Sequence, residues 1–382
     1  MKYVVVVNGF ISGNAIAWEL VSRGYRCIHV YSSMEHFKDH FRENVSLLYD
    51  RNLIYTSHQK FTTDVWGLDI IAVVAGTDSG SELADIISYD LELVAGNKPA
   101  PLRYLRDLLY VANGGSAARE NFQKFVDDHP EHERFVVKPL ISEGGCDRVQ
   151  FFNRDVDFVD QPGMFIAPFH PGVEYAIDTV SAKGQHKVCA VWRYTPHQGT
   201  DHWRHRIDLV DPVAESELVR RLHAYVSNVL NLSRQLWGAA HTEVKVDGDN
   251  IHLMEVNFRN NGHMDLGTTK VAFEGSQVER VASVMTGDLS VMTDLSSYKI
   301  KEYVLKIFFM NKKERHYSEF AWHKIASMPS VSHVFQHYRF FETIPVSEMN
   351  YRSIPAIIVM KNKDQEQLDA DEKQLRKLLD EY

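Results

Sequence analysis

Charged side chains interrupt two apolar runs in the segment HTEVKVDGDNIHLMEVNFRN, residues 241–260. The runs are joined by Asp-Gly-Asp-Asn, and a turn signal of this kind predicts a β-hairpin. Glu255, Asn257 and Arg259 alternate along the second run, so they project from one face of the strand. Glu243 lies on the first run and is the remaining candidate for that face.

The register of the hairpin decides whether the two carboxylates meet. Glu243 lies opposite Glu255 if the connecting loop has an odd number of residues, such as 248–250. An even loop would turn Glu243 to the other face of the sheet. The candidate site therefore requires an odd loop.

This set of side chains suits a divalent metal ion. Two carboxylates on a half-buried sheet repel each other, so a cation is expected between them. Carboxylate and amide oxygens are the hard ligands that Mg²⁺ or Mn²⁺ prefers. Glu243, Glu255 and Asn257 are therefore candidate metal ligands. Arg259 is suited to hold a phosphoryl group beside the metal. The alternative is a solvated hairpin face with an incidental Glu-Arg pair.

A second set of residues could bind phosphates. Lys138 ends the apolar run FVVK, which would deliver its amine to a fixed point. The loop Ser142-Glu143-Gly144-Gly145-Cys146 follows, and its glycines would let backbone N–H groups approach phosphate oxygens. It is not a P-loop, because no G-K-[ST] follows. Lys138 also fits a surface position at a strand end, and Lys98 is a weaker candidate by itself.

The composition is typical of a globular protein and excludes some functions. The chain has 382 residues, 44% of them hydrophobic and 24% charged, enough for two or three domains. A formal charge of −9 without a long basic run argues against a nucleic-acid partner. No segment resembles a membrane span, so no membrane partner is expected. Cys27, Cys146 and Cys189 are scattered, which fits a reducing cytoplasm.

Strand and helix patterns alternate at the start of the chain. The expected elements are a strand at 3–7, a helix at 14–24, a strand at 27–33, a strand at 69–76 and a helix beginning at 81. This order predicts a parallel, helix-covered sheet of the βαβ type over the first 95 residues. The turn with Gly9 and Gly13 does not match G-x-G-x-x-G, so it is either a tight turn or a loop facing a substrate.

The order of these motifs resembles a known superfamily. Lys98, Lys138 with its glycine loop, Gly172-Val173-Glu174 and then E-x11-E-x-N-x-R resemble the ATP-grasp carboxylate–amine ligases over residues 1–290. The phrases AGTDSGSELADIISYDLELVAGNK, FVVKPLISEGG, VWRYT and GAAHTEVKV…MEVNFR are most similar to the L-amino-acid ligases. That group contains the bacilysin-forming and dapdiamide-forming enzymes.

The resemblance implies the fold and its division. The expected fold class is α/β, turning to α+β in the central and C-terminal parts, with an ATP-grasp fold after an N-terminal parallel βαβ domain. The expected domains are a Rossmann-like pre-ATP-grasp domain at 1–95, a small ATP-grasp subdomain with the glycine-rich loop at 96–166, and a C-terminal ATP-grasp domain with the metal-binding hairpin at 167–382.

The resemblance also implies a role for each matching position. Lys98 and Lys138 would contact the phosphates of ATP, and the loop with Ser142, Gly144 and Gly145 would close over them. The backbone of Pro168, Phe169 and His170 would recognise the adenine, and Glu174 the ribose. Glu243, Glu255 and Asn257 would hold Mg²⁺ (or Mn²⁺), while Arg259 would hold the transferred phosphoryl group and the acyl phosphate.

Two positions depart from the family's pattern. Ala167 stands where the family usually has a Glu, so an adenine or ribose contact is in doubt. The sequence after Arg259 is Asn260-Asn261-Gly262, where the family often has a Gly-Gly pair near the acyl site. Asn260 is therefore a candidate substrate residue, and substrate choice is the property most affected.

The implied function is an ATP-dependent ligase. It would join an amino acid or small carboxylic acid to an amino acid through an acyl phosphate, releasing ADP and phosphate. Its partners would be the carboxylate and amine substrates, and a homodimer is common in the family. The rivals are an ATP-grasp carboxylase or phosphotransferase, and a nucleotide-binding regulatory protein without turnover.

Several other residues have two interpretations. Arg193 in VWRYT is either a contact for the substrate carboxylate or an arginine on a strand face. His202 and His205 fit a substrate-domain loop better than a zinc site. Cys146 is expected to be a small loop residue, and His241 a buried histidine with satisfied hydrogen bonds rather than a metal ligand.

Overall fold

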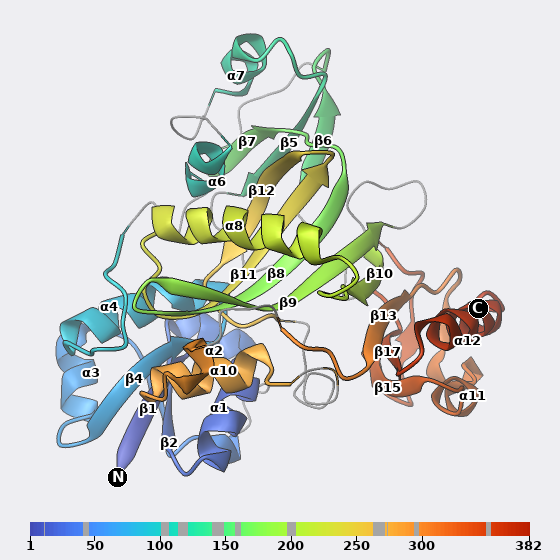
Figure 1. The fold of residues 1–382 in the computed structure, drawn as a ribbon. Helices are drawn as coiled ribbons and strands as arrows, with labels where there is room; N and C mark the ends of the chain where they lie inside the picture. The colour runs from blue at the N-terminus through green and yellow to red at the C-terminus, as the bar shows by residue number, and fades with distance from the viewer. Residues whose placement is uncertain are drawn as a thin grey trace.

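The computed structural model describes the chain apart from residues 11, 41–45, 101–106, 114–120, 140–148, 157–161, 197–203, 263–271, 273, 294–297 and 349–352. A parallel N-terminal sheet, a small antiparallel sheet and a large antiparallel sheet form the described part (Figure 1). The expected fold class is confirmed. Among the described helices, none is both long and apolar enough to cross a membrane.

The N-terminal sheet has four parallel strands in the order β3-β2-β1-β4. Its elements are β1 (Lys2–Val7), α1 (Ser12–Ser22), β2 (Arg26–Tyr31), α2 (Met34–His40), β3 (Arg51–Ile54), α3 (His58–Asp64), β4 (Asp69–Ala75) and α4 (Ser81–Asp90). The predicted βαβ unit is confirmed. The short elements α2, β3 and α3 were not expected, because segments of this length carry little periodicity.

The small sheet has the order β6-β5-β7 and is antiparallel. It contains β5 (Arg134–Pro139), β6 (Gln150–Asn153) and β7 (Met164–Pro168), and α6 (Asp107–Ala112) and α7 (Phe122–Asp128) precede it in the chain. Phe135 joins sheet to helix, since its ring lies 5.7 Å from that of Phe152 and 6.2 Å from that of Phe125. This aromatic packing fixes β5, which carries Lys138 at its end.

The large sheet has eight strands in the order β12-β11-β8-β9-β10-β13-β17-β15, all paired antiparallel. The strands are β8 (Val173–Ala182), β9 (Gln185–Pro196), β10 (Arg204–Leu209), β11 (Gly238–Asp247), β12 (Asn250–Asn257), β13 (Tyr303–Phe309), β15 (Val331–Gln336) and β17 (Ala356–Asn362). Helix α8 (Ser216–Leu232) lies across one face (Figure 1) and buries Leu222 and Val226 there.

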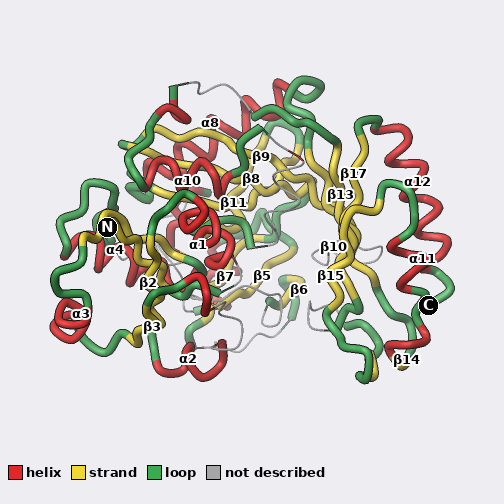
Figure 2. Tube along the Cα trace, turned by 90° about the horizontal axis from the view of Figure 1, so that it is seen from below, coloured by secondary structure: helices red, strands yellow, loops and turns green. Residues whose placement is uncertain are grey.

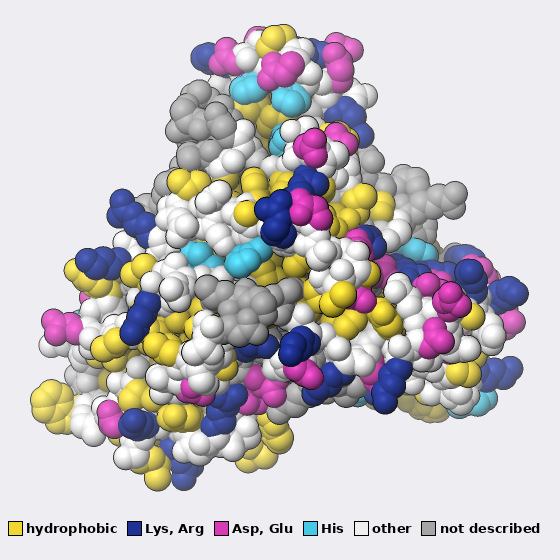
Figure 3. Space-filling model, in the orientation of Figure 1, with side chains coloured by type: hydrophobic (Ala, Val, Ile, Leu, Met, Phe, Trp, Pro, Cys, Tyr) yellow, Lys and Arg dark blue, Asp and Glu magenta, His cyan; other side chains and the backbone are white. Residues whose placement is uncertain are grey.

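The C-terminal elements cover the far end of this sheet. They are β14 (Arg315–His316), α11 (Trp322–Ala326), β16 (Thr343–Ile344) and α12 (Gln365–Leu379). Asp364 caps α12 by accepting hydrogen bonds from two backbone N–H groups. Figure 2 shows the N-terminus and the C-terminus at opposite sides of the molecule. Acidic and basic side chains are interspersed on the face that Figure 3 shows.

One hydrophobic core joins the N-terminal sheet to the large sheet. Helix α10 (Gln277–Met285) contributes Val281 and Met285 to it, together with Val4 of β1 and Ile16 of α1. Val180 of β8 and Ala239 of β11 belong to the same core. The carboxyl edge of the parallel sheet is thereby held against the strands that carry the candidate site.

A buried histidine fixes the turn after β1. His29 in β2 is fully buried, and its Nε2 accepts a hydrogen bond of 2.7 Å from the backbone N–H of Gly9. Its Nδ1 lies 3.1 Å from Oδ1 of Asn52. The ring must be neutral to accept at Nε2, and burial lowers the pKa of His29 to about 4.

We predict that His29 makes folding acid-sensitive. In the unfolded chain its pKa is about 6.5, above the value in the folded protein. Neutral His29 therefore contributes about 3 kcal/mol to the free energy of unfolding above a pH of about 6.5. This contribution is lost as the pH falls toward 4. Urea unfolding across this pH range should show a smaller loss for His29→Gln than for the wild type. The exposed His333→Gln serves as the control, and equal losses in all three proteins would contradict the prediction.

Candidate functional site

The hairpin brings the two carboxylates together by a route that the sequence analysis did not foresee. Strands β11 and β12 are joined by a two-residue turn at 248–249, so the expectation of an odd loop was wrong. A β-bulge at Met254 then inserts one extra residue into β12. Beyond the bulge Glu243 pairs directly with Glu255. The bulge does what an odd loop would have done.

The candidate metal ligands share one face of the sheet. Directly opposed residues in an antiparallel pair project to the same side, so Glu243 and Glu255 do so together. Asn257 lies opposite His241 two residues further along, on the same side. Asn257 is buried, and Glu243 is largely so. Oxygen donors from two adjacent strands are thereby gathered at one place.

Lys138 reaches this hairpin from the small sheet. Its ammonium donates a hydrogen bond of 3.1 Å to the backbone carbonyl of Met254, the bulged residue. The lysine side chain is buried although it carries a charge. Its interaction with the bulge carbonyl fixes the end of β5 beside Glu255. The alternative that Lys138 is an exposed surface residue does not hold.

Arg259 forms a buried ion pair with Asp78, which follows the last strand of the N-terminal sheet. Its Nη2 and Nε donate to the same oxygen of Asp78, at 2.9 and 3.2 Å, and its Nη1 donates to the carbonyl of Asn260 at 3.0 Å. Burial alone would lower the pKa of Arg259, but Asp78, Glu255 and Glu243 raise it, so the guanidinium stays charged. Among the described residues, the second oxygen of Asp78 has no hydrogen-bond partner.

His241 links the metal face to a second buried carboxylate. Its Nδ1 lies 2.7 Å from Asp178 and its Nε2 lies 3.3 Å from Glu243. Both carboxylates only accept hydrogen bonds, and although burial opposes the charge, they raise the pKa of His241 to about 9. Asp178 also accepts from Trp192 at 2.8 Å and from Asn261 at 3.0 Å. His241 therefore has both ring nitrogens satisfied, as expected.

The segment that follows β7 is held by cations. The Phe169 ring lies 4.2 Å from the Arg134 guanidinium carbon and 4.4 Å from the Lys245 ammonium. The Phe169 N–H donates to the carbonyl of Arg134, so this N–H is already engaged within the protein. Pro168 ends β7 just before it.

His170 continues this segment and stacks on the hairpin. Its ring lies 3.8 Å from the ring of His252 at an angle of 5°. Burial, together with the neighbouring histidines and lysines, lowers the pKa of His170 to about 3, so the ring is neutral. Within the described part of the chain its buried Nε2 has no hydrogen-bond partner. The stack ties the end of the small sheet to β12.

The remaining expected nucleotide contacts are scattered or undescribed. Glu174 is the second residue of β8 and pairs with Lys245 of β11 in the ladder. Lys98 is exposed in the segment after α4. Ser142, Gly144 and Gly145 lie outside the described residues, as do Cys146 and His202.

Two candidate substrate residues, Arg193 and Asn260, have contacts within the protein. Arg193 lies opposite Tyr175 on β8, on the face that α8 covers, and forms an ion pair with Glu215. This is the face opposite Glu243, so the position fits the strand-face alternative. Asn260 is 2% exposed and lines a buried cavity.

A metal ion at this site would need ligands beyond the protein. In the described residues, no three His, Cys, Asp or Glu side chains converge as a metal site. Glu243, Glu255 and the Asn257 amide thus match an ion that keeps water or phosphate oxygens in its other positions, as Mg²⁺ does. Cys27 and Cys189 are buried free thiols in the hydrophobic core that joins the N-terminal sheet to the large sheet.

Two acidic residues of the site, Asp78 and Asp178, were not among the residues predicted from the sequence. Asp78 follows β4 directly, and the carboxyl ends of parallel strands are the usual place for ligand sites. That signal could have found it. Asp178 is a charged residue inside an apolar strand, which indicates a buried network. Their partners are distant in sequence, so only the folded chain identifies them.

The fold matches solved structures over nearly the whole chain. L-amino acid ligase from Bacillus licheniformis has a TM-score of 0.72 at 14% identity, covering 99% of this chain and 97% of that one. Carboxyaminoimidazole ribonucleotide synthase from Aspergillus clavatus, complexed with ATP, has 0.68 at 11%, covering 99% and 98%. Phosphoribosylglycinamide synthetase from Anaerococcus prevotii has 0.66 at 11%, covering 98% of both chains.

These similarities define the fold class of the chain. No protein-family model and no curated protein matches the sequence. At identities this low the likeness concerns the fold, which is the ATP-grasp fold expected from the motifs.

We predict that Asp78 and Arg259 stabilise the fold as one unit. Removing one partner leaves a buried charge without its counterpart, which costs about 3 to 5 kcal/mol. Asp78→Asn and Arg259→Gln, made singly and together, complete a double-mutant cycle measured by urea unfolding. We expect a coupling energy of about 1 kcal/mol or more. Arg26 and Asp50, an exposed pair 3.0 Å apart, should couple more weakly. Additive losses at Asp78 and Arg259 would show that the pair is not coupled.

Proposed function

We propose that this protein is an ATP-dependent carboxylate–amine ligase. It joins an amino acid or small carboxylic acid to the amine of an amino acid through an acyl phosphate, and releases ADP and phosphate. The observation that carries the proposal is the direct pairing of Glu243 with Glu255 on one face, with Asn257 beside them and Arg259 just beyond. Such a set suits a metal–phosphate centre, and the ATP-grasp fold supports the same assignment.

The metal ligands of the proposed site are Glu243, Glu255 and Asn257. Their oxygen chemistry and shared face fit Mg²⁺ or Mn²⁺. When bound, the ion supplies charge neutralisation for the phosphates of ATP. His241 binds one oxygen of Glu243, which limits the orientations of that carboxylate. The protein thus fixes its own ligands before the nucleotide arrives.

Two lysines and the glycine loop would contact the phosphates of ATP. Lys138 is fixed on the bulge of β12, next to Glu255, and Lys98 would approach from its exposed segment. The glycine loop with Ser142, Gly144 and Gly145 would close over the phosphates. The segment Pro168–His170 would contact the adenine, and Glu174 the ribose.

The reaction requires a carboxylate to become an electrophile. Transfer of the γ-phosphoryl group from ATP to the carboxylate gives an acyl phosphate, which an amine attacks to form the amide and release phosphate. Arg259 would hold the phosphoryl group, because Asp78 fixes its guanidinium through two donors to one oxygen. Alignment and charge neutralisation are the main contributions of the protein.

The substrate classes distinguish this proposal from its rivals. The similarity in sequence motifs to L-amino-acid ligases favours amino acids on both sides of the new bond. A second candidate is ATP-dependent carboxylation of an amine, because the fold is also similar to carboxyaminoimidazole ribonucleotide synthase. A nucleotide-binding regulatory protein without turnover is the third.

An ADP-release screen tests these alternatives. The protein, ATP and Mg²⁺ are combined with pairs of amino acids and dicarboxylic acids, and separately with bicarbonate and aminoimidazole ribonucleotide. We expect ADP release that requires both an acid and an amine, with an amide product in the mass spectrum. Release that requires bicarbonate would support the carboxylase, and release with a single acceptor the phosphotransferase. If no ADP is released under any condition, the result would support the nucleotide-binding regulatory protein without turnover.

We predict that Glu255→Gln and Lys138→Ala abolish amine-dependent ADP release while the protein stays folded. The first removes a metal-binding charge and the second a phosphate-binding charge. Electron paramagnetic resonance of Mn²⁺ with the nucleotide gives a second measurement, in which Glu255→Gln should weaken Mn²⁺ binding at least about tenfold. Glu217→Gln on the exposed side of α8 is the matched control. Wild-type turnover by either site variant would refute the assignment.

A further inference from the structure

A small polar cavity lies between the N-terminal sheet and the large sheet, beside Arg259. Its volume is about 30 Å³. Side chains of α4, the segment before β11, the end of β12 and α10 line it. A cavity of this size holds one or two water-sized occupants and is too small for an amino acid or a nucleotide. The cavity therefore cannot be the binding site for the proposed substrates.

Oxygen atoms without partners line this cavity. Among the described residues, Oγ of Ser88, Oε1 of Gln235 and Oδ1 of Asn260 are buried and have no hydrogen-bond partner. Each of the three side chains is 2% exposed. Buried polar atoms in folded proteins are almost always satisfied. Three such atoms at one cavity indicate an occupant that interacts with oxygen.

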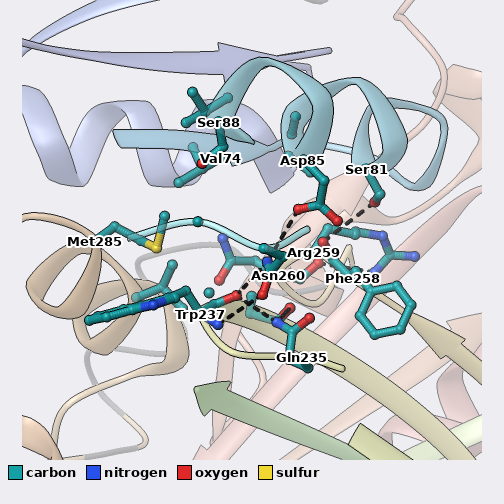
Figure 4. A pocket seen from close by; sticks show the side chains of 18 residues that line it. Val74, Ser81, Asp85, Ser88, Gln235, Trp237, Phe258, Arg259, Asn260 and Met285 are labelled. Carbon is teal, nitrogen blue, oxygen red and sulfur yellow. Dashed lines mark hydrogen bonds between the residues drawn. The ribbon is translucent and has the colours of Figure 1, made fainter. Parts of the chain in front are cut away.

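The orientation of Gln235 is fixed by its own amide. Its Nε2 donates to the carbonyls of Trp237 and Ala239, at 2.7 and 3.3 Å, so its Oε1 must be the atom left over. Asp85 adds a buried carboxylate, whose Oδ1 accepts from Asn97 at 3.2 Å. Figure 4 shows Asp85 entering from α4 on one side and Gln235 from the opposite side.

We propose that the cavity is a binding site for one monovalent cation, K⁺, Na⁺ or ammonium. Three neutral oxygens and one carboxylate match a single positive charge. A single water molecule donates two hydrogen bonds and cannot satisfy the three oxygens that lack a partner, whereas one cation can contact all three. Mg²⁺ dehydrates reluctantly and prefers sites with more charge. The lining therefore suits a monovalent ion better than water or a divalent metal.

The cation would link the N-terminal domain to the strand that carries the candidate site. Ser88 and Asp85 belong to α4, whereas Asn260 follows Arg259 at the end of β12. The carbonyl of Asn260 accepts a hydrogen bond from Arg259. An ion on the Asn260 side chain would thus fix the residue that orients the guanidinium. The site does not depend on the proposed ligase activity.

Anomalous scattering tests the site directly. Crystals of the full chain are soaked in Tl⁺ or Rb⁺, which replace K⁺ and scatter anomalously. We expect an anomalous peak within the cavity, near Gln235 and Asn260. Density for water alone, without an anomalous peak in any soaked crystal, would overturn the proposal.

Thermal unfolding tests the site in solution. Chloride salts of K⁺, Na⁺ and ammonium are compared with tetramethylammonium at constant ionic strength. We expect at least one small cation to raise the midpoint saturably by about 2 °C or more, since ligands that bind the folded state stabilise it. An identical response to all four salts would overturn the proposal.

Matched serine variants tie the response to the cavity. Ser88→Ala removes one lining oxygen and should raise the half-saturating cation concentration about tenfold. Ser233→Ala is the control, because that buried hydroxyl donates to the carbonyl of Leu230 away from the cavity. Gly96→Ala gives a second variant, since its added Cβ would lie 2.0 Å from Oγ of Ser88 and occupy the same space. Unchanged half-saturation in both Ser88→Ala and Gly96→Ala would overturn the assignment.

Discussion

Two carboxylates, Glu243 and Glu255, are fixed directly opposite each other across β11 and β12, and their repulsion must be compensated. Positive groups come from three directions. His241 contacts Glu243 from the same strand, Arg259 lies just past β12, and Lys138 approaches from the small sheet. These cations offset part of the negative charge, and the carboxylate and amide oxygens are ligands that suit a divalent ion.

The parallel N-terminal sheet contributes to this charge compensation through the segment that follows β4. Asp78 follows a strand of the parallel sheet and binds the guanidinium of Arg259, which the large sheet supplies. The hydrophobic core that the two sheets share with α10 holds them close enough for that contact. The polar cavity lies in the same junction. A buried ion pair and a polar cavity are costly in an apolar interface, which favours a functional reason for both.

Several features of the site followed from the residues alone, and others did not. The alternation of Glu255 and Asn257 placed two candidate ligands on one face of β12, with Arg259 just beyond the strand. Glu243 does lie opposite Glu255, but a bulge at Met254 sets this register and not the odd loop that was expected. The bulge could not be predicted, because it has no signature in a run of apolar residues. Arg193 had two interpretations from the sequence, a substrate contact or an arginine on a strand face, and its ion pair with Glu215 fits the second.

By itself the sequence determined the fold class, the βαβ start, the hairpin and the chemical nature of its ligands, because these depend on local periodicity and residue type. Tertiary structure decided the partners: Asp78 for Arg259, Asp178 for His241, and Met254 for Lys138. Each of these pairs joins residues that are 63 or more positions apart along the chain. The sequence gives the chemistry of each side chain, but the packing of the sheets decides which charged side chains contact one another.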